Sequence, residues 1–137
     1  MQDLINWLRG VLDDDERVAR AATPGRWGAQ PGPSPHVLND EWEVVSDADG
    51  PDRHVVFTGH VGGGIVGEHN AAHIARHDPT TVLADIAAKR AIIDAYTTRA
   101  DLAARGGLVN RDPLGYAVRA LASAYRHRAG WKPEWEA

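Results

Sequence analysis

The sequence predicts a mostly helical α+β fold with about four helices and one small β-hairpin. Two observations favour this fold class. Apolar side chains recur at helical spacing in four segments, which are residues 3–22, 67–77, 79–104 and 113–128. Two short runs rich in β-forming residues, 41–45 and 54–58, flank a stretch of turn-forming residues. A chain of 137 residues is close to the usual domain size, so we predict a single domain over residues 1–137.

The first predicted helix is amphipathic, with Asp3 as its N-cap. Its expected buried stripe consists of Leu4, Trp7, Leu8, Val11, Leu12 and Val18. Thr23-Pro24-Gly25 ends the helix, and residues 23–40 are expected to form a flexible loop that is extended at its prolines.

The predicted hairpin covers residues 41–58, with turn-forming residues at 47–52 between its two strands. Two strands alone are only marginally stable in water, so we expect the hairpin to pack against the helices.

Three more helices are predicted after the hairpin. The short one at 67–77 follows a glycine loop and ends at Asp78-Pro79. Pro79 suits the first position of the next helix, and Asp78 can cap that helix. The expected buried stripe of this helix consists of Leu83, Ile86, Ala87, Ile93 and Tyr96. The last helix is predicted at 113–128.

An aromatic tail, residues 129–137, follows the last helix. We expect Trp131 and Trp135 to dock back on the domain, with contact to a partner as the alternative.

The most distinctive segment carries three histidines at positions i, i+4 and i+8: His69, His73 and His77. Side chains four residues apart lie nearly above one another on a helix, so we call this set the histidine ridge. Two imidazoles one turn apart can chelate a divalent metal such as zinc. A further ligand would then be needed, and Glu16 is the carboxylate that we single out.

Other sources of that ligand are His54, His60 and Asp78. Two alternatives need no metal: the histidines recognise a polar partner, or they form a solvated surface. The metalloprotease motif would place a glutamate directly after the first histidine, whereas Asn70 and Ile74 stand in those places. Acid–base catalysis by a histidine near Asp78 is a weaker hypothesis, because no activated nucleophile is recognisable.

Three other patterns have structural interpretations. The acidic run Asp13–Glu16 is expected to form a solvated face, with Arg17 and Arg20 as nearby partners. The glycine-rich loop at 59–67 lacks the lysine of a phosphate-binding loop, so we interpret it as a connector. Lys89-Arg90 is expected to bury its stems, with an anion contact facing the histidines as the alternative.

Composition narrows the function classes. A net charge of −4 does not favour a nucleic-acid binder. The absence of cysteine excludes disulfides and thiolate metal sites and fits a reducing compartment. No stretch approaches the roughly 20 apolar residues of a membrane helix, and no secretory signal is visible. We therefore predict a cytoplasmic protein that does not contact membranes.

Three segments resemble a known family: the stretch from Leu8 to Trp27, the sequence His73-Ile74-Ala75-Arg76-His77-Asp78-Pro79, and the close from Ala120 to Trp135. The chain is similar to small proteins of unknown function from actinobacteria and their phages. That resemblance implies an origin in a phage or prophage of a high-GC host. It implies no activity and no catalytic residues.

Taken together, these observations predict an accessory protein that acts as a binding module in the bacterial cytoplasm, with its status as an enzyme left open. The expected contact residues are His69, His73, Arg76, His77, Asp78, Trp131 and Trp135. The partner would be a protein or a small molecule, and self-association is a further interpretation. The alternative function is a metal-dependent hydrolase that uses His73, His77 and Glu16.

Overall fold

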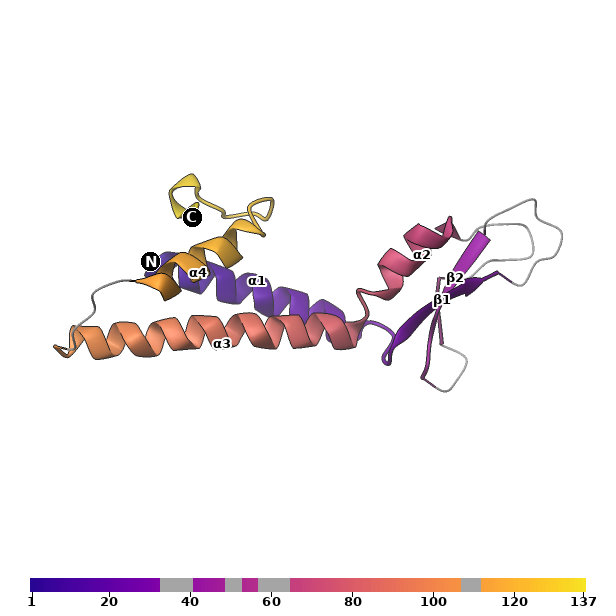
Figure 1. The fold of residues 1–137 in the computed structure, drawn as a ribbon, viewed down its shortest axis with the longest axis horizontal. Coiled ribbons are helices and arrows are strands. Elements are labelled where there is room, and N and C mark those ends of the chain that lie inside the picture. The colour runs from indigo at the N-terminus through magenta and orange to yellow at the C-terminus, as the bar shows by residue number, and fades with distance from the viewer. Residues whose placement is uncertain (33–40, 49–52, 57–64, 107–111) are drawn as a thin grey trace. The chain divides into compact units, whose positions relative to one another are not determined.

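The computed structural model describes residues 1–32, 41–48, 53–56, 65–106 and 112–137. Over these residues it contains four α-helices and a small antiparallel sheet, which confirms the mostly helical α+β prediction (Figure 1). The helices are α1 (Gln2–Ala21), α2 (Glu68–Ala75), α3 (Pro79–Ala104) and α4 (Pro113–Ser123). The strands are β1 (Trp27–Pro31), β2 (Glu41–Ser46), β3 (His54–Val56) and β4 (Ile65–Val66), and a 3-10 turn, η2 (Pro133–Trp135), lies near the C-terminus.

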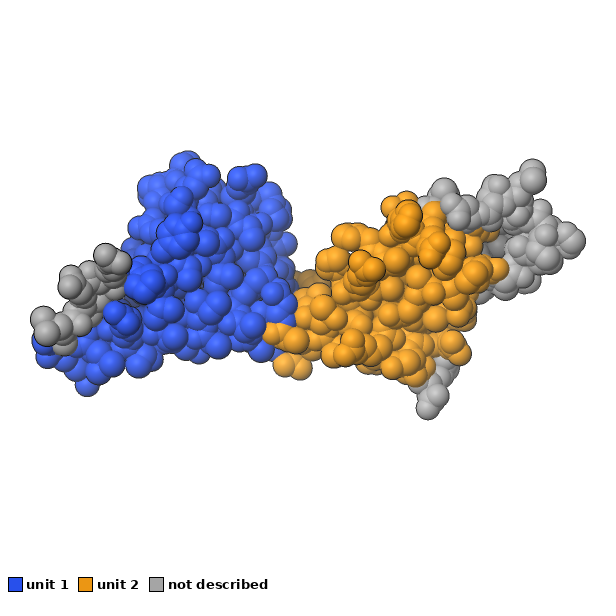
Figure 2. Space-filling view, in the orientation of Figure 1, with its two compact units in different colours: residues 1–16, 85–137 blue, residues 17–84 orange. Residues whose placement is uncertain are grey.

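Contacts within the chain divide it into two compact units, which Figure 2 distinguishes by colour. Unit 1 comprises Met1–Glu16 and Asp85–Ala137, and unit 2 comprises Arg17–Ala84. The division falls within α1 and α3, so each of these helices contributes to both units. The single domain over residues 1–137 stays a prediction.

Unit 2 is built on β2. β1 pairs with β2 in antiparallel register, Trp27 opposite Ser46 and Pro31 opposite Trp42. β3 and β4 also pair with β2. β2 therefore has neighbours along its length, and its residues from Glu43 to Ser46 are all buried. The predicted β2–β3 hairpin is confirmed.

Two strands were not predicted. β1 lies inside the stretch 23–40 that we expected to be a flexible loop, and β4 lies in the expected glycine connector. We predicted a loop for the first stretch because it is rich in proline, which is uncommon in strands. The strand tolerates Pro31 because this residue is its last one, where a missing N–H costs least.

The core of unit 2 is small and forms where α2 meets the sheet. Val44 and Ala71 are fully buried and Ala75 is 7% exposed. Ala71 and Ala75 stand one turn apart, and their short side chains allow α2 to lie close to the strands. The partly buried rings of Trp27 and Trp42 pack against this core.

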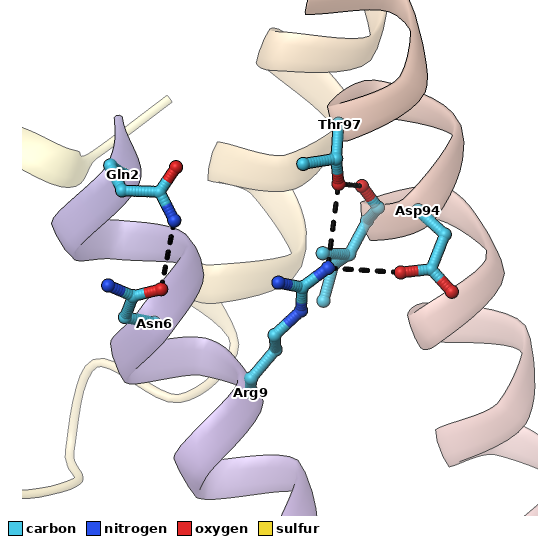
Figure 3. Close-up of polar contacts among 6 residues, drawn as sticks. Gln2, Asn6, Arg9, Asp94 and Thr97 are labelled. Atoms are coloured by element: carbon cyan, nitrogen blue, oxygen red, sulfur yellow. Dashed lines mark hydrogen bonds and ion pairs between the residues drawn. The ribbon is translucent and has the colours of Figure 1, made fainter. Parts of the chain in front are cut away.

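Unit 1 has a larger apolar interior. Side chains with 0% exposure come from three helices: Leu4, Leu8 and Leu12 from α1, Ile93 from α3, and Val118 from α4. Polar contacts also join α1 to α3. Nη2 of Arg9 donates to Oδ1 of Asp94 at 3.1 Å and to Oγ1 of Thr97 at 3.5 Å (Figure 3).

Two residues of the expected buried stripes are exposed. Val18 is 56% exposed, whereas the next residue, Ala19, is 7% exposed. Successive helical side chains point about 100° apart, so burial of Ala19 turns Val18 outward. Ala87 of α3 is likewise exposed, and Ile86 before it is 2% exposed.

The C-terminal tail packs on α1, as predicted. The rings of Trp131 and Trp135 lie 5.6 and 5.3 Å from that of Trp7, and the indole N–H of Trp7 donates to the carbonyl oxygen of Ala129 at 2.9 Å. Gly130 has φ +84°, and a Cβ there would lie 3.0 Å from the Trp7 nitrogen. The positive φ favours glycine in this turn. α4 ends at Ser123, whereas we predicted an end near residue 128.

The acidic run of α1 is held by arginines from later in the chain. Arg90 contacts Asp13 at 2.6 Å and Glu16 at 2.5 Å. Arg128 contacts Asp14 at 3.2 Å and Asp15 at 2.5 Å. We did not predict these partners. They also give Arg90 a structural role in unit 1.

Candidate functional site

The histidine ridge lies on the side of α2 that faces away from the sheet. Its three side chains are exposed, whereas Ala71 and Ala75 on the same helix are buried. α2 begins after Gly67, whose φ of +92° suits glycine, and its C-cap is Arg76. His77 therefore stands just beyond the helix, in the turn that leads to α3.

The last two histidines of the ridge lie side by side. The centroids of the His73 and His77 rings are 4.5 Å apart, with 54° between the ring planes. Nδ1 of His77 lies 2.7 Å from the carbonyl oxygen of His73. A carbonyl only accepts, so Nδ1 carries the proton and the neutral ring presents Nε2 as its acceptor. The pair thus displays adjacent hydrogen-bonding groups to solvent.

The described residues place no third ligand beside His73 and His77. Over that part of the chain, no group of three or more histidine, aspartate or glutamate side chains is placed to hold an ion. Glu16 belongs to unit 1, where it pairs with Arg90. His60 lies outside the described residues. A divalent cation such as zinc at His73 and His77 stays a prediction.

Asp78 is buried, with 3% exposure, and both of its oxygens accept from backbone amides. The Thr81 N–H donates to Oδ1 at 2.7 Å, which is the predicted cap of α3, and the Trp27 N–H donates to Oδ2 at 3.4 Å. Burial raises the pKa of this carboxyl, but hydrogen bonds from Thr81 and Trp27 and the nearby charge of Arg26 outweigh burial and hold it below the ordinary 3.8. Asp78 thus joins β1 to the start of α3.

A surface hollow of about 360 Å³ lies in unit 2 beside this carboxyl. Its lining includes Arg26, Trp27, Ala72, Ala75, Arg76 and Asp78. We call it the β1–α2 hollow. Two of these residues, Arg76 and Asp78, were predicted as contact residues. Arg26 and Trp27 were not, because only the pairing of β1 with β2 brings them next to the end of α2.

A second hollow of about 250 Å³ lies in unit 1 and is lined by Tyr96, Arg99 and Asp112, among others. Burial, helped by the charge of Asp112, raises the pKa of the Tyr96 phenol. Asp112 already accepts from the Gly115 N–H at 2.8 Å as the cap of α4. Asp112 therefore has a structural role.

Comparison with known proteins adds one finding. Residues 1–137 match a family described as a family of unknown function (DUF6221). The chain belongs to this family. No curated protein and no solved structure shows significant similarity to it. The prediction that the chain belongs to a family of unknown function is confirmed, and the DUF6221 match assigns no activity to any residue.

The predicted contact residues of this DUF6221 chain divide between the two units. The histidine ridge, Arg76 and Asp78 belong to unit 2, and Trp131 and Trp135 belong to unit 1. Trp135 is 7% exposed, so its ring offers little surface to a partner. In the described part of the chain, no helix has both the length and the apolar character to cross a membrane.

Proposed function

We propose that this DUF6221 protein is a non-enzymatic binding module, an accessory protein of phage or prophage type that acts in the cytoplasm of an actinobacterial host. Its contact surface is the histidine ridge together with Arg76. One observation carries the proposal: α2 is anchored to the sheet by Ala71 and Ala75 while its histidines remain exposed. The packing of Ala71 and Ala75 thus fixes the backbone of α2, from which His69 and His73 project into solvent.

The chemistry of this surface suits a polar or acidic partner. A neutral imidazole has one donor and one acceptor. The donor of His77 is already bonded to the His73 carbonyl, so this ring offers its Nε2 acceptor, and Arg76 adds a planar group of five donors. Such a partner is a protein surface or a small molecule, and a second copy of this chain is one such protein.

The test compares two variants of untagged protein. His73→Ala/His77→Ala removes two exposed rings from the ridge, and His127→Ala removes an exposed histidine from unit 1 as a matched control. The wild type and both variants are immobilised and exposed to extract from an actinobacterial host. Retained species are identified, and their affinities are then measured with purified components.

We expect a species that the wild type and His127→Ala retain and that the double variant loses, while all three proteins unfold at the same denaturant concentration. Equal retention by all three would refute the ridge as the contact surface. A large loss of stability in the double variant would assign the histidines a structural role. Metal analysis of the same untagged protein addresses the hydrolase, because a resident metal near one per chain would replace this proposal.

A further inference from the structure

Two cationic side chains line the β1–α2 hollow. Arg26 and Arg76 both line it, and both residues are exposed. Neither guanidinium makes a hydrogen bond or an ion pair with another described residue, whereas Arg90 and Arg128 in unit 1 each contact two carboxylates. The two free forks at one hollow match the geometry with which arginine holds carboxylate and phosphate groups.

The carboxylate at the same hollow offsets only part of this charge. Asp78 is 3% exposed, and its oxygens accept from the amides of Thr81 and Trp27. It interacts electrostatically with Arg26 as well. Two arginines against one buried carboxylate leave the lining with a net positive charge.

The rest of the lining is apolar and small. The Trp27 side chain, fixed by a hydrogen bond from its indole N–H to the Thr23 carbonyl at 2.9 Å, forms one part. Ala29, Ala72 and Ala75 add only methyl groups, which leaves space above the core of unit 2. A ligand with a flat or aliphatic part would bury that part here while its charged end meets the arginines.

From this arrangement we propose that the β1–α2 hollow binds an organic anion, whose phosphate or carboxylate group pairs with Arg26 and Arg76 and whose apolar part lies against Trp27. The proposal rests on the proposed function and gives it a ligand chemistry. It also adds Arg26 and Trp27 to the contact surface defined by the histidine ridge.

Phenyl phosphate, benzoate and inorganic phosphate are the probes, each titrated into the full chain at constant ionic strength with sodium chloride as reference. Two-dimensional NMR follows the backbone amides of Trp27, Arg76 and Thr81 and the Trp27 indole. The variants are Arg26→Gln and Arg76→Gln. Arg53→Gln is the matched control, because it removes the same charge from an exposed site of unit 2 that does not line the hollow.

We expect an aromatic anion to shift these signals and to bind more tightly than inorganic phosphate. Each lining variant should weaken binding by about ten- to a hundredfold, the usual loss for a hydrogen bond to a charged group, and Arg53→Gln should bind like the wild type. The ratio of phenyl phosphate to benzoate affinity identifies the charged group. Equal weakening by all three variants, or shifts no larger than those from chloride, would overturn the inference.

The two proposals fail separately. Arg26 is not part of the histidine ridge, so retention of a ridge-dependent partner by Arg26→Gln, combined with no anion binding, would remove this inference and leave the proposed function standing. If His73→Ala/His77→Ala still binds the anion and no partner depends on the ridge, the proposed function is refuted and the anion site remains.

Discussion

The two units use their charged residues differently. In unit 1, Arg90 and Arg128 each contact two carboxylates of α1, and Arg9 contacts Asp94. In unit 2, Arg26 and Arg76 border a hollow without an ion pair to any described residue. The ridge histidines, of which His77 directly follows Arg76, are exposed.

The apolar interiors of the two units also differ. Unit 1 fully buries long side chains from three helices, including Leu8, Ile93 and Val118. In the core of unit 2 the buried residues are Val44 and two alanines, and the larger side chains against them are only partly buried. Apolar area that stays in contact with water gives less hydrophobic stabilisation, so we expect unit 1 to contribute more of the stability. Four predictions test this contrast.

The largest effect is expected in the interior of unit 1. Leu8→Ala should lower the free energy of unfolding by about 2–5 kcal/mol, because Leu8 is fully buried and its truncation leaves a cavity. Urea unfolding measures the change. Leu102→Ala is the control, since Leu102 is 61% exposed. Equal losses from the two variants would contradict the assignment of this interior.

Asp78→Ala should lower the free energy of unfolding by about 1–2 kcal/mol, because it leaves the Thr81 N–H without its hydrogen-bond acceptor. The folded pKa of Asp78 is lowered, so its contribution to stability is present above pH 3.8 and is lost as pH falls through the folded value. Urea unfolding at pH 7 and at pH 3 should therefore show a smaller difference for Asp78→Asn than for the wild type. An unchanged pH dependence would mean that this carboxyl is not the titrating group.

Arg90→Gln should lower the free energy of unfolding by about 1 kcal/mol or less, because partly exposed ion pairs contribute modestly. The loss should shrink in high salt. Arg26→Gln should instead change stability by less than about 0.5 kcal/mol, as expected for a surface residue. The contrast between the units would disappear if Arg26→Gln were the more destabilising of the two.

The smallest change in stability is expected at Val18, which the helical spacing of apolar residues had predicted to be buried. Val18→Ser should change stability by less than about 0.5 kcal/mol, because Val18 is 56% exposed. Burial of a valine would instead be worth roughly 1.5–3 kcal/mol. A thermal denaturation curve for this variant therefore decides between the helical pattern and the structure.

Local patterns accounted for most of the helices. The apolar spacing located α1 and α3 within a few residues, and the Asp78-Pro79 pair located the start of α3 together with its cap. The placement of the ridge histidines on one side also follows from spacing, because residues four apart share a side of a helix. These features depend on interactions within a turn or two of the chain.

The errors arose where distant segments meet. We did not predict β1, because prolines are unusual in strands and this strand is stabilised by its pairing with β2. The arginine partners of the acidic run lie much later in the chain: Asp13 and Arg90 are 77 residues apart, and Asp14 and Arg128 are 114 residues apart. The β1–α2 hollow was not predicted as a site either, since Arg26 and Arg76 are 50 residues apart in sequence.

The sequence by itself determined the helices, the pairing of the hairpin strands, the cap at Asp78 and the shared side of the ridge histidines, because helical periodicity, turn residues and capping act over a few neighbouring residues. The tertiary structure alone decided which charges are neutralised and which remain available. Ion pairing requires atoms within a few ångströms of each other, and that proximity is set by the packing of strands and helices from separate parts of the chain.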